Sequence, residues 1–477
     1  MALTKVHSRM LDRETTVNVK DYYNLTSGGT DWSPAFQQAI DDLATSSDTY
    51  TGGVLFVPRG NYPIGSTITV DTTNAAALTS LTIQGEGMHN TVLQCSSGFT
   101  GTVALDVTEA TYCSFKDFHL FGSNPSNCDN GMRLVEGSEI QIERVFCQRF
   151  NDSGFLVQRC FMITMEQCRA KSCLTNFNFA SDYSSGTGGY NTSVDCRNCY
   201  SLNTLTNGQG FWINDMAYSS FTACASDFAG RYGYRIGNVG AVCFNGCGNE
   251  KSGRAGFYFE ASAALDAALI NGTRCSLNDC FSWLADQDNS GYGSIYSDQV
   301  DTSVIDVSVR NFKELDVTGA VSVAAQGVST DHSITFENCD FINSLDGVAA
   351  KFSASTSVRE NAVSITAANT AVLDLKSVFE NTNIYSGVLH VIASNGTYAQ
   401  QSALNTAAYV LLVTKSTGGS GVVEIAKNGL TTGGAANHPS FTWSLDTTNN
   451  QLEASPVGST TGTFFFYVSQ IGGMEIS

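Results

Sequence analysis

A short apolar pattern returns at intervals through the middle of the chain. In a unit of six residues, positions 1, 3 and 6 are mostly apolar or Cys, and successive units start 23 to 33 residues apart. Apolar residues at alternate positions are typical of a strand with one buried face. The unit occurs as CSFKDF at 113, IQIERV at 140, ITMEQC at 163, VDCRNC at 194, SSFTAC at 219, VCFNGC at 242, CSLNDC at 275, VSVRNF at 307 and ITFENC at 334.

A second unit follows most of these, usually begins with Gly or Asn, and carries apolar residues at positions 2 and 4. It reads GMRLVE at 131, GFLVQR at 154, NFNFAS at 176, GFWIND at 210, GYRIGN at 233 and GFYFEA at 256, with weaker matches GAVSVA at 319 and GVAAKF at 347. Because neither unit can bury its apolar face alone, the repeat predicts a parallel solenoid with coils about 4.8 Å apart. A leucine-rich repeat does not fit, because its leucine spacing is absent and nothing helical separates the strands.

Different patterns flank this repeat. Phe36, Ile40 and Leu43 fall on one face of an expected helix over residues 34–44, with Ser33 as its candidate cap. After about residue 356, longer segments such as AAYVLLVTK and GTFFFYVSQIG alternate apolar and polar residues between turns. That period of two predicts an antiparallel β-sandwich. We therefore expect an all-β protein, with a parallel β-helix followed by a C-terminal sandwich.

Composition narrows the class of protein. The formal net charge is -19, and clusters of Lys and Arg are absent, so nucleic acid is an unsuitable partner. No apolar run is long enough to predict a membrane-spanning helix. The opening MALTKVHSRM lacks the apolar stretch of a secretory signal peptide. An odd count of 15 cysteines without such a signal favours folding in a reducing compartment.

Cysteine recurs at position 6 of the first unit, so stacked coils would place these thiols in one interior row. A zinc site needs four converging ligands, for which Cys196/Cys199 and Cys243/Cys247 are the nearest candidates. A row along the solenoid axis does not converge, so small buried thiols are favoured over zinc or disulfides. We expect no metal and no cofactor. The row consists of Cys168, Cys199, Cys224, Cys247, Cys280 and Cys339.

Positions 3 and 5 of the second unit should point outward and form a column along successive coils. Sugar rings stack on aromatic faces, and their hydroxyls bind amides, carboxylates and guanidinium groups. The column predicts an oligosaccharide-binding face, while ordinary surface covered by a neighbouring subunit is an equal alternative. Its expected binding residues are Trp212, Arg235, Tyr258 and Asn214, together with the loop arginines Arg231 and Arg254.

Glycoside cleavage needs two carboxylates, and the sequence offers two pairs. Asp215 and Glu260 belong to coils two apart, or about 9 to 10 Å, which suits inversion. Asp227 and Glu250 each lie three residues after a position-6 cysteine, so equal loops would stack them about 5 Å apart.

Two such close carboxylates raise the pKa of one, which favours a general acid. The alternative is a loop network of ion pairs with Arg231 and Arg254, each seven residues after the same cysteines. Exposed pairs of that kind contribute little. Asp182 and Asp266 are weaker candidates on insertions beside the column.

Residues 19–95 resemble the opening of the pectate-lyase-like family of right-handed parallel β-helices. The matching features are a turn at 28–31, the expected helix, a strand at 52–62 with the GG-x-x-x-x-P-x-G-x-Y spacing, and a GEG turn at 85–87. Within that family, MALTKVHSRM and the run from 437 to 472 resemble the start and the C-terminal domain of phage tailspikes. The expected parts are a connecting segment (1–20), an entry region with capping helix (21–110), the β-helix (111–355) and a sandwich (356–477).

The resemblance implies a homotrimeric tailspike on the virion tail, synthesised in the host cytoplasm and acting outside the host cell. Its implied activity is endo-glycosidic hydrolysis of a bacterial surface polysaccharide. The alternatives are a lyase acting by β-elimination and a receptor-binding spike without activity. A lyase needs a base and charge neutralisation. No tight Asp cluster for Ca²⁺ is present, although Arg235, Arg254, Lys251 and Tyr258 remain candidate groups.

Overall fold

The computed structural model describes most of the chain up to residue 318 and shorter segments beyond it. The described residues are 16–44, 51–71, 78–122, 128–179, 189–261, 272–299, 304–318, 321–326, 332–341, 344–346, 350–352, 358–359, 363–365, 370–374, 385–394, 405–416, 419–431, 441–448, 451–457 and 462–474.

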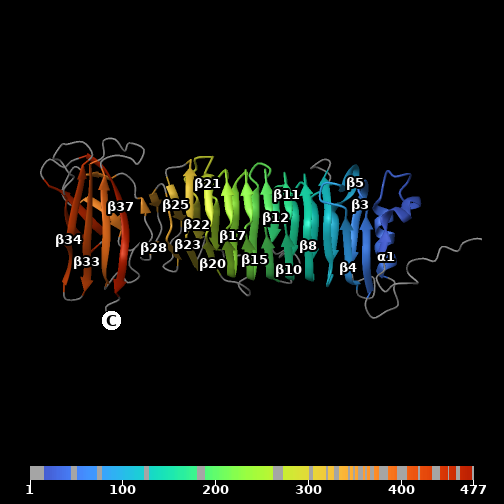
Figure 1. Ribbon diagram of the computed structural model, residues 1–477, viewed down its shortest axis with the longest axis horizontal. Helices are drawn as coiled ribbons and strands as arrows, with labels where there is room; N and C mark the ends of the chain where they lie inside the picture. Colours follow the sequence, from blue (N-terminus) through green and yellow to red (C-terminus); the bar gives the residue numbers. More distant parts are fainter. Residues whose placement is uncertain are drawn as a thin grey trace, which may run out of the picture.

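A parallel β-helix makes up the middle of the molecule, and its strands follow one another along the long axis (Figure 1). Its coils stack into three parallel sheets. Sheet 1 holds the first sequence unit and comprises β2 (Thr51–Val57), β4 (Leu78–Gly85), β6 (Ser114–Gly122), β8 (Ser138–Gln148), β10 (Phe161–Glu166), β13 (Asn191–Arg197), the second halves of β15 (Gln209–Thr222) and β17 (Tyr232–Asn245), β20 (Thr273–Asn278), β23 (Ile305–Arg310), β26 (His332–Glu337) and β28 (Ala350–Phe352), with β1 (Thr16–Asn18) paired to β2.

Sheets 2 and 3 complete each coil. Sheet 2 contains the first halves of β3 (Gly60–Asp71) and β5 (Thr91–Thr108), the second halves of β6 and β8, then β11 (Arg169–Lys171), β14 (Tyr200–Leu202), β16 (Ala225–Asp227), β18 (Gly248–Glu250), β21 (Phe281–Ala285) and β24 (Lys313–Val317). Sheet 3 holds the second sequence unit and contains the second halves of β3 and β5, then β7 (Asn130–Val135), β9 (Ser153–Gln158), β12 (Thr175–Phe179), the first halves of β15 and β17, β19 (Phe257–Ala261), β22 (Ile295–Gln299), β25 (Val321–Gln326) and β27 (Ser344–Asp346).

A left-handed residue ends each sheet-1 strand from β6 to β26 and turns the chain into sheet 2. It occupies position 5 of the first unit, and its φ lies between 50° and 62° on these nine coils. Asn, Asp and Gly adopt this conformation most readily, which explains their frequency before position 6. These residues are Asp117, Arg144, Gln167, Asn198, Ala223, Gly246, Asp279, Asn311 and Asn338.

Stacked side chains form the core. Phe155, Phe177, Phe211, Tyr234 and Phe257 are fully buried on five successive coils, with neighbouring ring centroids 4.7 to 5.1 Å apart and nearly parallel planes. Such stacking links each coil to the next, which no single coil could do by itself.

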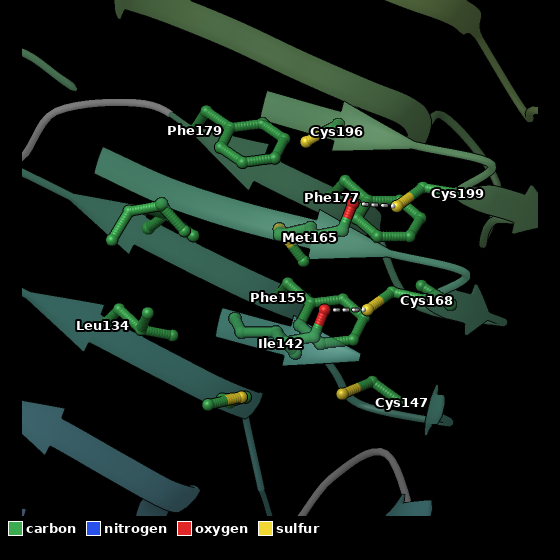
Figure 2. Packing of buried hydrophobic residues seen from close by; sticks show 14 of the residues in the cluster. Leu134, Ile142, Cys147, Phe155, Met165, Cys168, Phe177, Phe179, Cys196 and Cys199 are labelled. Atoms are coloured by element: carbon green, nitrogen blue, oxygen red, sulfur yellow. Dashed lines mark hydrogen bonds between the residues drawn. The ribbon is translucent and has the colours of Figure 1, made fainter. Parts of the chain in front are cut away.

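The predicted cysteine row lies in the same interior and is confirmed. Each position-6 thiol contacts a carbonyl oxygen of the preceding coil at 3.3 to 3.5 Å, and Figure 2 shows this for Cys168 and Cys199. All 15 cysteines are free, and only Cys243 is partly exposed. The thiols therefore act as small apolar side chains with a weak hydrogen bond.

Helix α1 (Ser33–Ala44) covers one end of the β-helix, next to the short helix η2 (Val19–Leu25) (Figure 1). Phe36, Ile40 and Leu43 are buried, as expected. The prediction that Ser33 caps this helix is wrong. Its hydroxyl accepts hydrogen bonds from the backbone N–H groups of Gly65 and Ser66, while Asp31 accepts from the N–H of Ser33. Ser33 thus fastens the helix to β3.

Two antiparallel sheets lie at the other end (Figure 1). One consists of β29 (Val358–Arg359), β30 (Val363–Ile365), β37 (Gly462–Met474), β32 (Tyr385–Ser394), β33 (Asn405–Ser416) and β34 (Gly419–Thr431), and the other of β31 (Thr370–Asp374), β36 (Gln451–Pro456) and β35 (Phe441–Asp446). The all-β prediction of a parallel β-helix with a C-terminal antiparallel sheet pair is confirmed. The expected boundary at 356 lies outside the described residues, and trimerisation by this part stays a prediction.

Among the described residues, no helix has the length and apolar character needed to cross a membrane.

Candidate functional site

The outer face of sheet 2 brings carboxylates, aromatic rings and cations together on consecutive coils. In the strands β14, β16 and β18 the middle residue faces the interior, and Ser201, Ser226 and Asn249 are fully buried. The residues on either side therefore face outward. One outward row is Tyr200, Ala225, Gly248 and Phe281, and the other is Leu202, Asp227, Glu250 and Trp283.

Asp227 and Glu250 are direct register partners on neighbouring coils, as the equal loop lengths predicted. Both side chains are half-buried. The hydroxyl of Tyr200 donates to Oδ2 of Asp227 at 2.6 Å, and Nζ of Lys251 lies 3.3 Å from Oε1 of Glu250. Each carboxylate thus has its own polar partner, although the two face the same surface.

The environment of Asp227 favours its protonated form. Burial raises the pKa of Asp227, and the nearby charge of Glu250 raises it further, while the bond from Tyr200 and the charge of Lys251 lower it, leaving a net rise. The pKa of Tyr200 is also raised, first by burial and then by its bond to Asp227, so its phenol stays protonated as a donor. A carboxyl with a raised pKa beside a second carboxylate is the arrangement of a general acid and its partner.

Exposed aromatic rings flank this pair. Phe228 and Trp283 are 45% and 37% exposed, and the ammonium of Lys251 lies 4.8 and 5.2 Å from their ring centroids. Phe281 extends the surface over Gly248, where a Cβ would lie only 2.4 Å from its ring. Exposed rings beside polar groups are suited to stacking against sugar rings.

Unpaired cations precede the pair along sheet 2. Arg169 and Lys171 point outward from β11, one coil before Tyr200 and Leu202, and Arg149 lies beside the end of that strand. None of the three forms an ion pair with a described residue. In contrast, carboxylates pair with the guanidinium groups of Arg133, Arg144, Arg159, Arg197, Arg235 and Arg310.

The predicted column on sheet 3 exists as a register row, but it is largely covered. Trp212, Arg235 and Tyr258 stack on three successive coils. The guanidinium carbon of Arg235 lies 4.6 Å from the Trp212 ring centroid, and Arg235 forms two hydrogen bonds with Glu260 at 2.9 and 3.1 Å. The expectation that Tyr258 is exposed is wrong.

Tyr258 is only 6% exposed, because rings from neighbouring coils cover it. Its ring stacks on Tyr232 and Tyr296, at centroid distances of 4.2 and 5.7 Å, and its hydroxyl donates to Asp298. This aromatic packing explains the aromatic residues of the column without a bound sugar.

Asn214 lies inside the protein, contrary to the outward position expected of it, and so does Asp215 beside it. They are 3% and 2% exposed, respectively, and the amide of Asn214 donates to Asp215 at 2.5 Å. Asp215 occupies the left-handed corner between sheets 3 and 1, with φ of 52°. Asn214 and Glu260 approach each other over Gly237, where no side chain separates them. A buried Asp215 and an ion-paired Glu260 form a less accessible pair than Asp227 and Glu250.

Arg231 and Arg254 stack in register but face tyrosines. Their guanidinium carbons lie 4.8 Å from the ring centroid of Tyr232 and 5.1 Å from that of Tyr292, respectively. The expected ion-pair network with Asp227 and Glu250 is therefore wrong for these arginines among the described residues. Asp182 and Asp266 lie outside the described residues.

Sequence reasoning missed Tyr200, Trp283, Phe228 and the two free cations of β11. The signal was nonetheless present. The residues one and three after each position-6 cysteine are the outward residues of sheet 2, and they read Arg169 and Lys171, Tyr200 and Leu202, Ala225 and Asp227, Gly248 and Glu250, Phe281 and Trp283. Three residues are too few for a recognisable strand pattern, so only the two acids drew notice.

The described residues contain no group of three or more His, Cys, Asp or Glu side chains that could hold a metal ion.

Residues 16–249 match the model of the family described as Rhamnogalacturonase A/epimerase, pectate lyase-like. The match ends within the candidate site, one residue before Glu250. Together with the three parallel sheets, it confirms the resemblance, and the chain carries a pectate lyase-like parallel β-helix. No curated protein matches the sequence significantly.

Several solved structures are similar over much of the chain. The tailspike of Acinetobacter phage vB_ApiP_P1 is 15% identical, with a TM-score of 0.43, and the match covers 98% of this chain and 91% of that one. The tailspike gp49 of Acinetobacter baumannii bacteriophage Fri1, a capsular polysaccharide depolymerase, is 13% identical, with a TM-score of 0.48 and coverages of 96% and 86%. The A-module of the Azotobacter vinelandii mannuronan C-5 epimerase AlgE4 is 16% identical, with a TM-score of 0.45 and coverages of 71% and 97%. Similarities this weak do not determine activity.

Proposed function

We propose that this protein is a phage tailspike that binds a bacterial surface polysaccharide and cleaves it by endo-glycosidic hydrolysis. The observation that carries the proposal is the register pair Asp227 and Glu250, half-buried on one face and flanked by exposed Phe228 and Trp283. The pectate lyase-like domain and the sequence resemblance to tailspikes at both ends of the chain support it. Because a fold alone does not give an activity, the proposal is tested at the site residues.

In the proposed reaction Asp227 is the general acid. Its raised pKa favours the protonated carboxyl, which transfers its proton to the glycosidic oxygen as the bond to the anomeric carbon breaks. Glu250, beside Lys251, is the nucleophile that forms a bond to that carbon. Asp227 then takes a proton from water, which attacks the same carbon and releases Glu250 and the second sugar product.

The spacing of the pair favours this retaining course over inversion. Neighbouring strands lie about 4.8 Å apart, close to the separation of about 5 Å between the carboxyls of retaining glycosidases. An inverting enzyme needs room for a water molecule between substrate and base. The proposal therefore predicts that the new reducing end keeps the anomeric configuration of the cleaved bond, which NMR of the first products can measure.

Incubation with purified polysaccharides from candidate hosts distinguishes the proposal from its alternatives. Hydrolysis produces reducing ends alone, β-elimination produces reducing ends together with absorbance from an unsaturated uronate, and a receptor-binding spike produces neither. Light scattering on the full chain tests the proposed homotrimer, and antibody labelling of purified phage tests the proposed place on the virion tail.

A further inference from the structure

A row of outward residues runs along the corner where the chain enters sheet 1. Each has a left-handed backbone, with φ between 49° and 57°, and strand pairing on the residue before or after places them one above another. We call this the corner row, and it consists of Tyr112, Glu139, Met162, Ser193, Tyr218 and Ala241. The large members are exposed: Tyr112 by 58%, Met162 by 52% and Tyr218 by 73%.

A hollow of about 510 Å³ lies beside the first four members of the corner row. Its floor is the outward row of sheet 1, where Ser114, Gln141 and Thr164 are register partners on successive coils. Its rim carries the phenol ring of Tyr112, the carboxylate of Glu139 and the hydroxyl of Ser193. The lining therefore offers hydroxyls, one amide, one carboxylate and one aromatic ring.

Ser114 shows that the floor is not ordinary surface. It is 8% exposed, and its Oγ has no hydrogen-bond partner among the described residues. A buried hydroxyl without a partner is destabilising unless something else completes its hydrogen bonding. Ser114 lines the hollow, and its Oγ is covered in the absence of a ligand, so rotation of the side chain toward the hollow lets a ligand complete its hydrogen bonding.

We propose that this hollow is a second, non-catalytic binding site for a sugar residue of a polysaccharide. A sugar can stack on Tyr112 while its hydroxyls form hydrogen bonds with Ser114, Gln141 and Glu139. An apolar ligand could stack on the ring but could not form these hydrogen bonds. The location also fits, because β10 supplies Met162 and Thr164 and then leads round one corner into β11 with Arg169. One chain of polysaccharide could span both faces and be held near the cleavage site.

This inference goes beyond the proposed function, since it concerns retention of the polymer and not its cleavage. Its test uses the full chain with Glu250→Gln, which prevents cleavage during measurement. An array of purified neutral and acidic bacterial polysaccharides identifies the polymer that binds, and titration calorimetry then gives its affinity. Ser114→Ala and Tyr112→Ala should each weaken binding about five- to tenfold, the effect of losing one hydrogen bond or one stacked ring.

Tyr218→Ala is the matched control, because Tyr218 lies in the same corner row with the same backbone conformation but outside the hollow. It should bind as tightly as the parent. Equal weakening by Tyr218→Ala, unchanged affinity in both hollow variants, or no binding on the array would each overturn the site. So would a change of oligomeric state with Tyr112→Ala, measured by light scattering, because the row would then be an interface between copies of the chain.

The two proposals fail separately. Without the Glu250 change, Tyr112→Ala should cleave short oligosaccharides at the parent rate and lose processing of long polymer. If the parent cleaves nothing while binding still depends on Tyr112 and Ser114, the hydrolase proposal is refuted and the second site stands.

Discussion

Replacing Tyr200 by Phe should shift the pH dependence of cleavage. The Tyr200 hydroxyl donates to the Asp227 carboxylate at 2.6 Å, which stabilises the ionised form and lowers the Asp227 pKa. Hydrogen bonds to charged groups contribute about 1.5 to 3 kcal/mol, and the half-exposed position of the pair argues for the lower end. Since 1.36 kcal/mol corresponds to one pKa unit, the Asp227 pKa should rise by about one unit in the variant.

A general acid is active while protonated, so the alkaline limb of the pH–rate profile depends on the Asp227 pKa. With Tyr200→Phe this limb should move about one unit to higher pH, because the acid stays protonated to higher pH. Initial rates of reducing-end formation from pH 4 to 9 measure the shift, with buffers of constant ionic strength. An alkaline limb that stays in place, or moves to lower pH, would refute the assignment of Asp227 as the acid. A purely structural role for Tyr200 would lower the rate equally at every pH.

Three further outcomes follow from the structure. In the native protein about one thiol per chain should react with a thiol reagent, and this reaction should disappear in Cys243→Ser. After denaturation all 15 thiols should react. Several fast-reacting thiols in the native protein would contradict the interior row. Phe211→Ala should lower the free energy of unfolding of the β-helix by about 3 to 5 kcal/mol, because Phe211 is stacked between Phe177 and Tyr234. The loss should appear as a lower thermal midpoint, whereas Tyr218→Ala at an exposed position should leave the midpoint unchanged. Arg169→Gln with Lys171→Gln should raise KM for an acidic polysaccharide and weaken its dependence on salt, with kcat nearly constant; equal losses in kcat and kcat/KM would place these cations in the chemistry instead.

The sequence predicts the interior of this protein better than its exterior. Apolar residues at alternate positions specify sheets 1 and 3, and cysteine at position 6 marks the corner between sheets 1 and 2, because each coil must present the same inner face to the next. Those inner residues, such as Phe211 and Cys224, are fully or almost fully buried, as predicted.

Outward residues follow no such constraint. The alternation correctly predicts that Tyr258 points away from the core. However, Tyr232, Tyr292 and Tyr296 cover its ring. This coverage depends on the paths of loops, which the repeat does not encode. Asp215, at position 6 of the second unit, shares the inward face of positions 2 and 4 and is buried in a left-handed corner. Asp227 and Glu250 were predictable because their offset from a buried cysteine is fixed, and buried positions set the register.

The central claim is that Asp227 and Glu250 cleave a polysaccharide on the outer face of sheet 2. Reducing-end release and unsaturated-uronate absorbance should be measured together, on the polysaccharide that the protein binds, for the parent, Asp227→Asn, Glu250→Gln and the control Glu260→Gln. The account predicts reducing ends without absorbance, rates about 10² to 10⁴ lower in the first two variants, and a far smaller loss in Glu260→Gln. Full activity in both Asp227→Asn and Glu250→Gln, or absorbance that rises with the reducing ends, would contradict it.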